Sequence, residues 1–187
     1  MRVITGRARG TVLKTPEGMQ TRPTADRVKE ALFSIIQFEV PGAKVLDLFG
    51  GSGQLGIEAI SRGATCAVFV DASDKACRLI RDNLKRTRFE NEGRVVCSDY
   101  MSYLNGCREK FDIILLDPPY AEVFLENSLK RITEIDILQT GGIIVAERPA
   151  DKALSLVFHG FTRSKDYKYG NTVLTIYRKD RQDETAT

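Results

Sequence analysis

Short apolar runs alternate with amphipathic helical patterns along most of the chain, from Ala43 onward. The runs VLDLF, AVFV and IILL are almost continuously apolar, which is typical of strands buried on both faces of a sheet. The segments between them, such as QLGIEAISR and DKACRLIRDNLKR, have the apolar spacing of helices that cover such a sheet. Strands that alternate with helices of this length predict parallel βαβ units, and therefore a doubly wound α/β sheet.

The length of 187 residues is enough for one domain with a substantial core. Residues 42–179 carry the alternating pattern and form the predicted main domain. Residues 1–41 are expected to be a basic extension that packs on this domain. FTRSKDYKY and NTVLTIYR predict an antiparallel pair of strands near the C-terminus, and the polar residues 180–187 predict a disordered tail.

The N-terminal extension combines two local patterns. Arg2–Thr5 and Thr11–Lys14 alternate like short strands around a glycine-containing segment, which predicts a β-hairpin or a loop. The run TRPTADRVKEALFSII has helical periodicity, with Thr24 as the predicted N-cap.

Composition excludes several classes of protein. No apolar run approaches the length of a membrane span, and the N-terminus lacks the apolar core of a secretory signal. We therefore expect a cytoplasmic protein with no membrane partner. The four cysteines form no C-x-x-C, so we expect no metal site.

The net charge of +3 is unevenly distributed. Residues 1–30 and residues 75–94 each carry seven Lys or Arg and three Asp or Glu, so the rest of the chain is acidic. Two basic segments on an acidic body indicate a surface for a polyanion such as nucleic acid. Two solvated helix faces are the alternative.

Five consecutive predicted strands end in an acidic side chain. Because ligands of doubly wound sheets bind at the carboxyl ends of the strands, these acids are expected to form a site. One or two of them would alternatively serve as helix N-caps. The five are Asp47, Asp71, Asp99, Asp117 and Glu147.

Residues Gly51–Gly56 spell G-x-G-x-x-G, the pattern of a dinucleotide-binding turn. The preceding Asp47 would repel a pyrophosphate but suits a cationic amine or sulfonium, which favours S-adenosylmethionine over a nicotinamide cofactor. Asp71 is placed to accept hydrogen bonds from ribose hydroxyls in either cofactor, or to cap the helix near Asp74. Asp99 is placed to accept from an adenine amine, or to cap the turn at MSYL.

Asp117-Pro118-Pro119-Tyr120 follows a buried strand. The prolines remove two N–H donors and hold the backbone extended, so that their carbonyls and the Asp117 carboxylate form a corner of acceptors beside an aromatic ring. Such a corner fits the amino group of a planar base stacked on Tyr120.

LDLFGGSG and LLDPPYA, in this order, resemble motifs I and IV of amino-group methyltransferases with the class I, S-adenosylmethionine-dependent fold. RVITGRARGTVL, TRPTADRVKEALFSII and YGNTVLTIY resemble the bacterial 16S ribosomal RNA guanine-N2 methyltransferases that act on guanine 966. The resemblance reaches about Arg178, and R-P-T-x-D-R-V is its most specific part. It implies a Rossmann-like, mostly parallel seven-stranded sheet with an antiparallel C-terminal strand.

The resemblance also implies the site residues. The catalytic residues would be Asp117, Pro118, Pro119 and Tyr120, which hold the target guanine. The cofactor residues would be Asp47, Phe49, Gly51, Gly53, Gly56, Asp71, Ala72, Asp99 and Tyr100. The RNA-binding residues would be Arg7, Arg9, Arg22, Thr24 and Arg27. Two positions depart from the family pattern: Gly50 stands where Ala or Ser is frequent, and Asp71 where Glu is common.

The expected reaction is direct methyl transfer to the N2 amine of a flipped guanine in 16S ribosomal RNA. The expected partner is that RNA in an assembled or assembling small ribosomal subunit, bound by a monomeric enzyme. Adenine-N6 methylation of DNA or another RNA remains an alternative, as do a nicotinamide oxidoreductase and a non-catalytic RNA-binding module.

Overall fold

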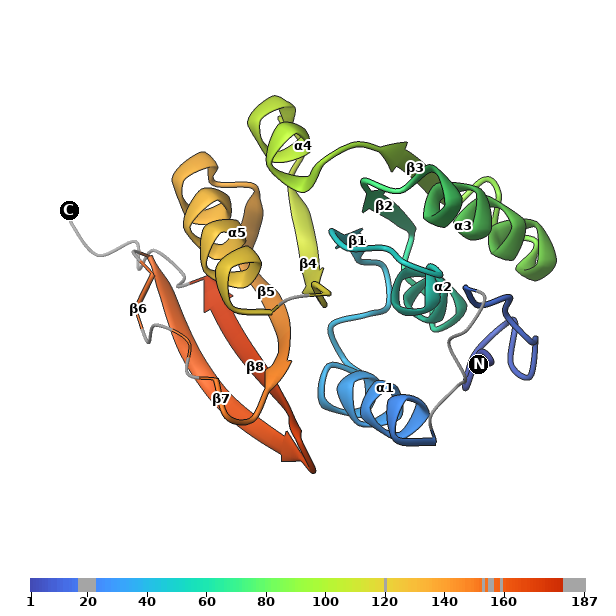
Figure 1. Ribbon diagram of the computed structural model, residues 1–187, viewed down its shortest axis with the longest axis horizontal. Coiled ribbons are helices and arrows are strands. Elements are labelled where there is room, and N and C mark those ends of the chain that lie inside the picture. Colours follow the sequence, from blue (N-terminus) through green and yellow to red (C-terminus); the bar gives the residue numbers. More distant parts are fainter. Residues whose placement is uncertain (17–22, 120, 153, 155–156, 159, 180–187) are drawn as a thin grey trace.

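The computed structural model describes residues 1–16, 23–119, 121–152, 154, 157–158 and 160–179. Its centre is a single sheet with the strand order β3-β2-β1-β4-β5-β8-β7-β6 (Figure 1). The strands are β1 (Lys44–Asp47), β2 (Cys66–Asp71), β3 (Gly93–Cys97), β4 (Phe111–Leu116), β5 (Leu138–Pro149), β6 (Val157–Phe158), β7 (Phe161–Tyr169) and β8 (Thr172–Lys179).

The strands β3, β2, β1, β4 and β5 are parallel, and β8 runs antiparallel to both of its neighbours. The predicted α/β class and the antiparallel C-terminal strand are thus confirmed. Within the described residues, the two-residue strand β6 extends the sheet beyond the seven strands that were expected. The predicted tail, residues 180–187, lies outside the described part.

The strand order reverses between β1 and β4. From β1 the chain adds β2 and β3 on one side, whereas β4 and β5 lie on the other. At such a switch point the loops that follow the two central strands diverge, and they leave a crevice at the carboxyl edge of the sheet. Asp47 ends β1 and Asp117 follows β4, so both predicted site residues border this crevice.

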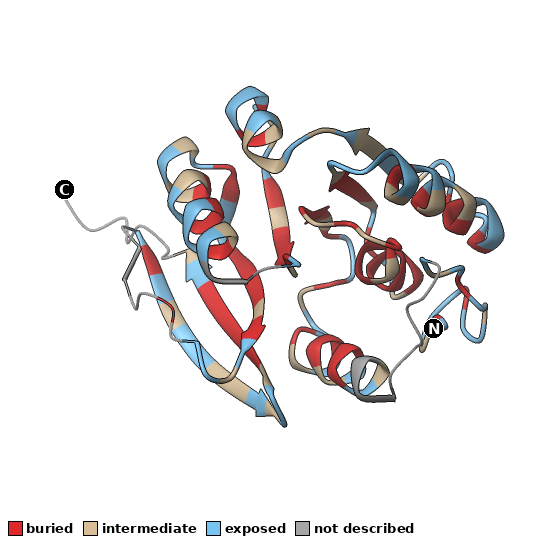
Figure 2. Ribbon diagram, in the orientation of Figure 1, coloured by how far each residue is buried: buried red, intermediate tan, exposed pale blue. Residues whose placement is uncertain are grey.

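Helices cover both faces of the sheet (Figure 1). On one face α1 (Pro23–Ile35), α2 (Gln54–Ser61) and α3 (Asp74–Thr87) pack in a core that includes Val45 and Ile113. On the other, α4 (Tyr100–Gly106) and α5 (Ala121–Ile135) pack in a core that includes Leu46 and Ile114. This alternation of side chains explains why the central strands are mostly apolar and largely buried in Figure 2. Among the described residues, no helix combines the length and apolar character that a membrane crossing requires.

The predicted N-terminal hairpin is present, but its two expected strands are reduced to a single antiparallel bridge between Arg2 and Val12. Backbone hydrogen bonds cross the hairpin, among them those from the Val3 N–H to the Thr11 carbonyl at 3.0 Å and from the Gly10 N–H to the Val3 carbonyl at 2.9 Å, and other donors bond to α2. The N–H groups of Ile4 and Thr5 donate to the carboxylate of Glu58, at 2.8 and 3.0 Å. These hydrogen bonds, from main-chain N–H groups to the Glu58 side chain, attach the N-terminal extension to the main domain.

The helix α1 begins at Pro23, so Thr24 lies within its first turn and is not the N-cap that was predicted. Proline suits the first helical position because its fixed φ matches the helix and its missing N–H would have no partner there. The side chain of Thr24 lies outside the described residues.

Candidate active site

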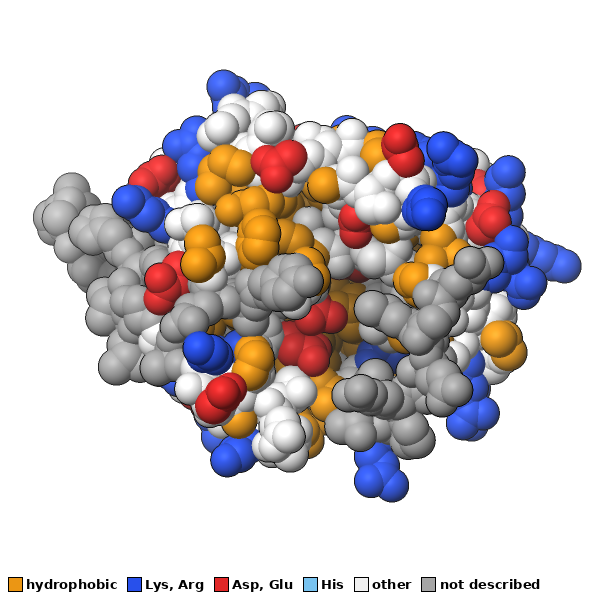
Figure 3. Space-filling model, viewed as in Figure 1, with side chains coloured by type: hydrophobic (Ala, Val, Ile, Leu, Met, Phe, Trp, Pro, Cys, Tyr) orange, Lys and Arg blue, Asp and Glu red, His pale blue; other side chains and the backbone are white. Residues whose placement is uncertain are grey.

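Acidic side chains gather at the carboxyl edge of the sheet. Asp47 and Asp71 end β1 and β2, and Asp117 follows β4. Leu116 of β4 pairs with Ala146 of β5, which places Asp117 beside Glu147 at the next position of the parallel strands. Figure 3 shows acidic side chains in the centre of this view, in a hollow bordered by apolar side chains.

The acidic groups influence one another's ionisation. The pKa of Asp47 is raised to about 7, chiefly by burial and also by the charges of Asp117 and Asp71, against the opposing hydrogen bond from Gly56. Burial also raises the pKa of Asp117 to about 6. The pKa of Glu147 rises to about 8 through burial and the charge of Asp117. Near neutral pH each of these carboxyls is therefore protonated in a fraction of the molecules, and a bound cation would favour the ionised forms.

This cluster predicts a stability that falls as pH rises from 5 to 8 in the cofactor-free protein. The folded state keeps protons on groups of raised pKa that the unfolded chain releases, so increasing pH lowers the free energy of unfolding. Each pKa unit corresponds to about 1.4 kcal/mol. Asp47→Asn should flatten the pH dependence of the unfolding free energy measured in urea. An unchanged slope in the variant would contradict the assigned pKa of Asp47.

The glycine turn after β1 depends on backbone geometry. Gly51 and Gly53 have φ angles of 53° and 78°, in the left-handed region that favours glycine. The Gly51 N–H donates to Asp71 Oδ2 at 2.9 Å, and the Gly53 N–H to the Gly50 carbonyl at 2.6 Å. These hydrogen bonds fix the backbone of the turn at the start of α2, where backbone N–H groups can face a ligand.

Gly56 has a different role from the other two glycines. A Cβ atom there would lie 2.2 Å from the Phe69 ring, so only glycine permits this approach of α2 to β2. Gly56 is buried, and its N–H donates to Asp47 Oδ2 at 3.0 Å. Gly56 therefore positions Asp47, and its cofactor contact stays a prediction.

Asp71 joins the first two loops of the edge. Its Oδ2 accepts from Gly51, and its Oδ1 accepts from the N–H of Ser73 at 2.8 Å. Ser73, and not Asp71, caps α3, so the alternative interpretation of Asp71 as that cap is wrong. Asp71 is half-buried beside the exposed Ala72, and its carboxylate oxygens retain lone pairs for a further donor.

Asp99 caps α4, as the structural alternative for this residue predicted. Its Oδ1 accepts from the N–H groups of Met101 and Ser102, at 2.9 and 3.1 Å. The same exposed side chain remains a candidate for the adenine amine through Oδ2.

Three rings form an aromatic cluster at the same edge: Phe49, Tyr100 and Phe124. The Phe49 and Tyr100 centroids are 5.3 Å apart, and Phe124 lies 5.4 Å from Tyr100 in an edge-on arrangement. The structure thus brings together two predicted cofactor residues. Phe124 was not included in the predicted site, because a phenylalanine within a helix such as α5 is also typical of the hydrophobic core. Such a cluster offers an apolar wall to a planar ring.

The predicted catalytic corner is described through Pro119. Asp117 is half-buried, Pro118 is buried and Pro119 is exposed, whereas Tyr120 lies outside the described residues. Glu147 was noted among the acidic strand ends without an individual role. Its position beside Asp117 follows from the register between β4 and β5, which the sequence pattern does not specify.

The predicted RNA-binding residues are in different situations. Arg7 lies over the Phe89 ring at 4.8 Å and pairs with Glu92 at 3.1 Å, so its guanidinium is engaged within the protein. Arg9 and Arg27 are exposed. Arg22 lies outside the described residues, as does the side chain of Thr24.

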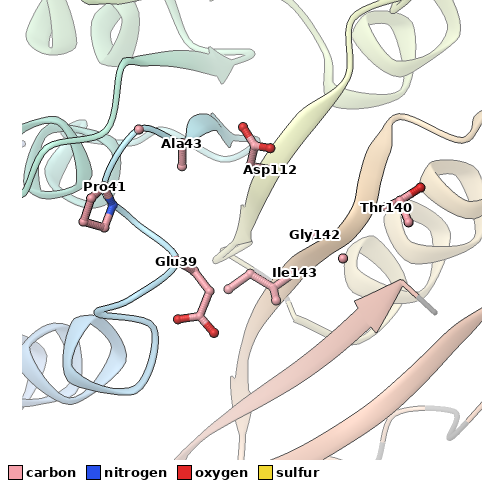
Figure 4. Close-up of a pocket in the computed structure, with 9 residues that line it drawn as sticks. Glu39, Pro41, Ala43, Asp112, Thr140, Gly142 and Ile143 are labelled. Atoms are coloured by element: carbon pink, nitrogen blue, oxygen red, sulfur yellow. The ribbon is translucent and has the colours of Figure 1, made fainter. Parts of the chain in front are cut away.

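A pocket of about 300 Å³ lies at the opposite edge of the sheet (Figure 4). Its lining includes Glu39, Ala43 and Asp112, next to the amino ends of β1 and β4. In doubly wound sheets ligands bind at the carboxyl ends, so this pocket is separate from the candidate active site.

Comparisons with known proteins agree with this arrangement. The family model described as Conserved hypothetical protein 95 matches residues 1–178. YlbH of Bacillus subtilis (strain 168) is 39% identical over 182 residues, which cover 96% of this chain and 99% of that protein. Ribosomal RNA small subunit methyltransferase D of Escherichia coli (strain K12) is 30% identical over 185 residues, which cover 99% of this chain and 93% of that protein.

The solved structure of the Escherichia coli protein yhhF superposes with a TM-score of 0.88 at 28% identity, over 97% of this chain and 99% of that chain. The family resemblance carried by the sequence motifs is confirmed. The chain therefore belongs to the Conserved hypothetical protein 95 family, the bacterial family of the ribosomal RNA small subunit methyltransferase D proteins.

Proposed function

We propose that this protein transfers a methyl group from S-adenosylmethionine to the exocyclic N2 amine of a guanine in 16S ribosomal RNA. The observation that carries the proposal is the acceptor corner at Asp117-Pro118-Pro119, which stands at the switch point beside the acidic edge. Membership of a family that includes a small-subunit ribosomal RNA methyltransferase supports the RNA substrate. The enzyme acts as a monomer on an assembled or assembling small subunit.

The residues at the carboxyl edge fit the cofactor. S-adenosylmethionine, when bound, supplies an electrophilic methyl group on a positively charged sulfur. The carboxyl of Asp47, at the end of β1, gives this part of the edge the negative potential that a cation requires. Asp71 has acceptor capacity for a ribose, and Phe49 and Tyr100 offer an aromatic wall near Asp99 for the adenine. A pyrophosphate would face repulsion from the carboxyl of Asp47, which disfavours a nicotinamide cofactor.

Chemistry at the guanine relies on acceptors and orientation. The N2 lone pair is delocalised into the ring, which makes the amine a poor nucleophile. When Asp117 and the Pro118 carbonyl accept the two N2 hydrogens, the lone pair is directed toward the methyl group. In this reaction the methyl carbon would pass from sulfur to nitrogen as the carbon–sulfur bond breaks, and Asp117 would accept the proton that nitrogen loses. Orientation of the reactants supplies most of the remaining acceleration.

Labelled methyl transfer to 16S ribosomal RNA tests this function. Small subunits that lack the modification should acquire label on one guanine, at N2, when mixed with the protein and labelled S-adenosylmethionine. Fully modified subunits serve as the control and should remain unlabelled. Label at an adenine, or binding of NAD without binding of S-adenosylmethionine in calorimetry, would contradict the proposal.

A further inference from the structure

The outer face of α3 carries a row of five Lys or Arg side chains, and Arg88 follows directly after the helix. At 3.6 residues per turn, these six cations span an arc of about 160° on the side away from the sheet. All six are exposed, and no ion pair joins any of them to another residue in the part of the chain that the structure describes. They are Lys75, Arg78, Arg81, Lys85, Arg86 and, directly after the helix, Arg88. Figure 3 shows Lys and Arg side chains over α3 at the right of the view.

The N-terminal segment is laid along this helix. Asn83, which is fully buried, accepts from the Lys14 N–H at 2.8 Å and donates to the Lys14 carbonyl at 2.9 Å. The Arg86 guanidinium also donates to the Val12 carbonyl at 3.5 Å. The two basic segments, about 70 residues apart in the sequence, therefore lie side by side where Val12 and Lys14 contact α3.

The same asparagine connects this surface to the active site. The Asn83 side chain donates a second hydrogen bond to the Ser52 carbonyl, at 2.8 Å, within the glycine turn. The first turn of α3 follows Asp71 at the carboxyl edge, and the helix then runs about 20 Å away from that edge. A polyanion on the surface would therefore extend outward from the site of methyl transfer.

We infer that the outer face of α3 binds the phosphate backbone of the RNA substrate. The inference rests on the proposed RNA substrate and adds a contact surface outside the residues expected to bind RNA. Unpaired cations that recur every three or four residues suit a chain of phosphates, because each contact releases counterions. The exposed acids within the row are few, and Asp82 is neutralised by Lys14 at 2.7 Å.

A charge-neutralising variant of the whole protein tests the inference. The triple variant R78Q/R81Q/K85Q removes three exposed cations of α3 that make no described side-chain contact. The control R108Q/K130Q/K168Q makes the same change in net charge at exposed positions after α4, on α5 and on β7. Affinity for transcribed 16S ribosomal RNA is measured at several KCl concentrations, without methyl donor.

The triple variant should bind this RNA about tenfold or more weakly at low salt, and the slope of log affinity against log salt should decrease by about 2. The control should stay within about twofold of the unmodified protein. Calorimetry with S-adenosylmethionine should give unchanged affinity for both, which shows that the fold is intact. Equal salt slopes in all three proteins would overturn the inference. Because binding is measured without methylation, failure of the proposed reaction would appear separately, in the labelling experiment.

Discussion

Replacement of Asp117 by alanine should lower the rate of methyl transfer at least about a thousandfold, while affinity for S-adenosylmethionine stays close to that of the unmodified protein. Asp117 is half-buried at the switch point and would accept a hydrogen from the reacting amine, so its loss removes an interaction made with the transition state. Single-turnover transfer of labelled methyl to unmodified small subunits measures the rate, and calorimetry measures cofactor affinity.

Two further variants sharpen this test. Asp117→Asn keeps the size of the side chain and one acceptor oxygen, and should lose less activity than Asp117→Ala. Asp151→Asn neutralises an exposed aspartate after β5 and should retain full activity. Unmodified turnover in Asp117→Ala would remove Asp117 from the mechanism, and equal loss of cofactor affinity and rate would assign it to cofactor binding instead.

Replacement of Glu58 by glutamine should destabilise the protein by about 3–5 kcal/mol, the range for breaking a buried ion pair. Glu58 is fully buried and accepts hydrogen bonds from Ile4, Thr5 and Arg62 Nε. Its Oε2 lies 3.8 Å from Lys29 Nζ, which is itself 1% exposed and donates to the Arg2 carbonyl at 2.7 Å. Burial lowers the pKa of Lys29, and the charge of Glu58 opposes that change.

The variant leaves the cation of Lys29 buried without its carboxylate partner. Urea unfolding measures the loss, and the double variant Lys29→Met/Glu58→Gln should recover part of it because the unpaired charge is then absent. Amide hydrogen exchange at Ile4 and Thr5 should accelerate in Glu58→Gln. A loss below about 1 kcal/mol would contradict a structural role for this ion pair.

The local sequence pattern was sufficient to predict the sheet and the types of residue that line the candidate site. Continuous apolar runs predicted central strands, since a strand covered on both faces has no solvent-facing side. Acidic residues at the ends of those runs predicted a shared edge, because parallel strands bring their carboxyl ends together. The left-handed conformations of Gly51 and Gly53 also agree with the glycine pattern.

Contacts between residues far apart in the sequence could not be predicted from local pattern. The N-terminal hairpin forms, but the pattern did not indicate that the N–H donors of Ile4 and Thr5 bond to Glu58, more than 50 residues away in the chain. Gly56 follows a ligand-binding pattern, yet its close approach to Phe69 makes it a packing position. Asp99 had two compatible interpretations, and only the backbone of α4 shows that it is a cap.

The sequence by itself determined the order of strands and helices, the acidic carboxyl edge and the place of Asp117 directly after a buried strand, because these follow from periodicity and from residue types at strand ends. Only the tertiary structure decided that Asp117 stands beside Glu147, that Phe124 joins Phe49 and Tyr100, and that the N-terminal segment lies on α3. The physical reason is that strand register, ring packing and the partner of a buried Asn83 are set by contacts between segments far apart in the chain.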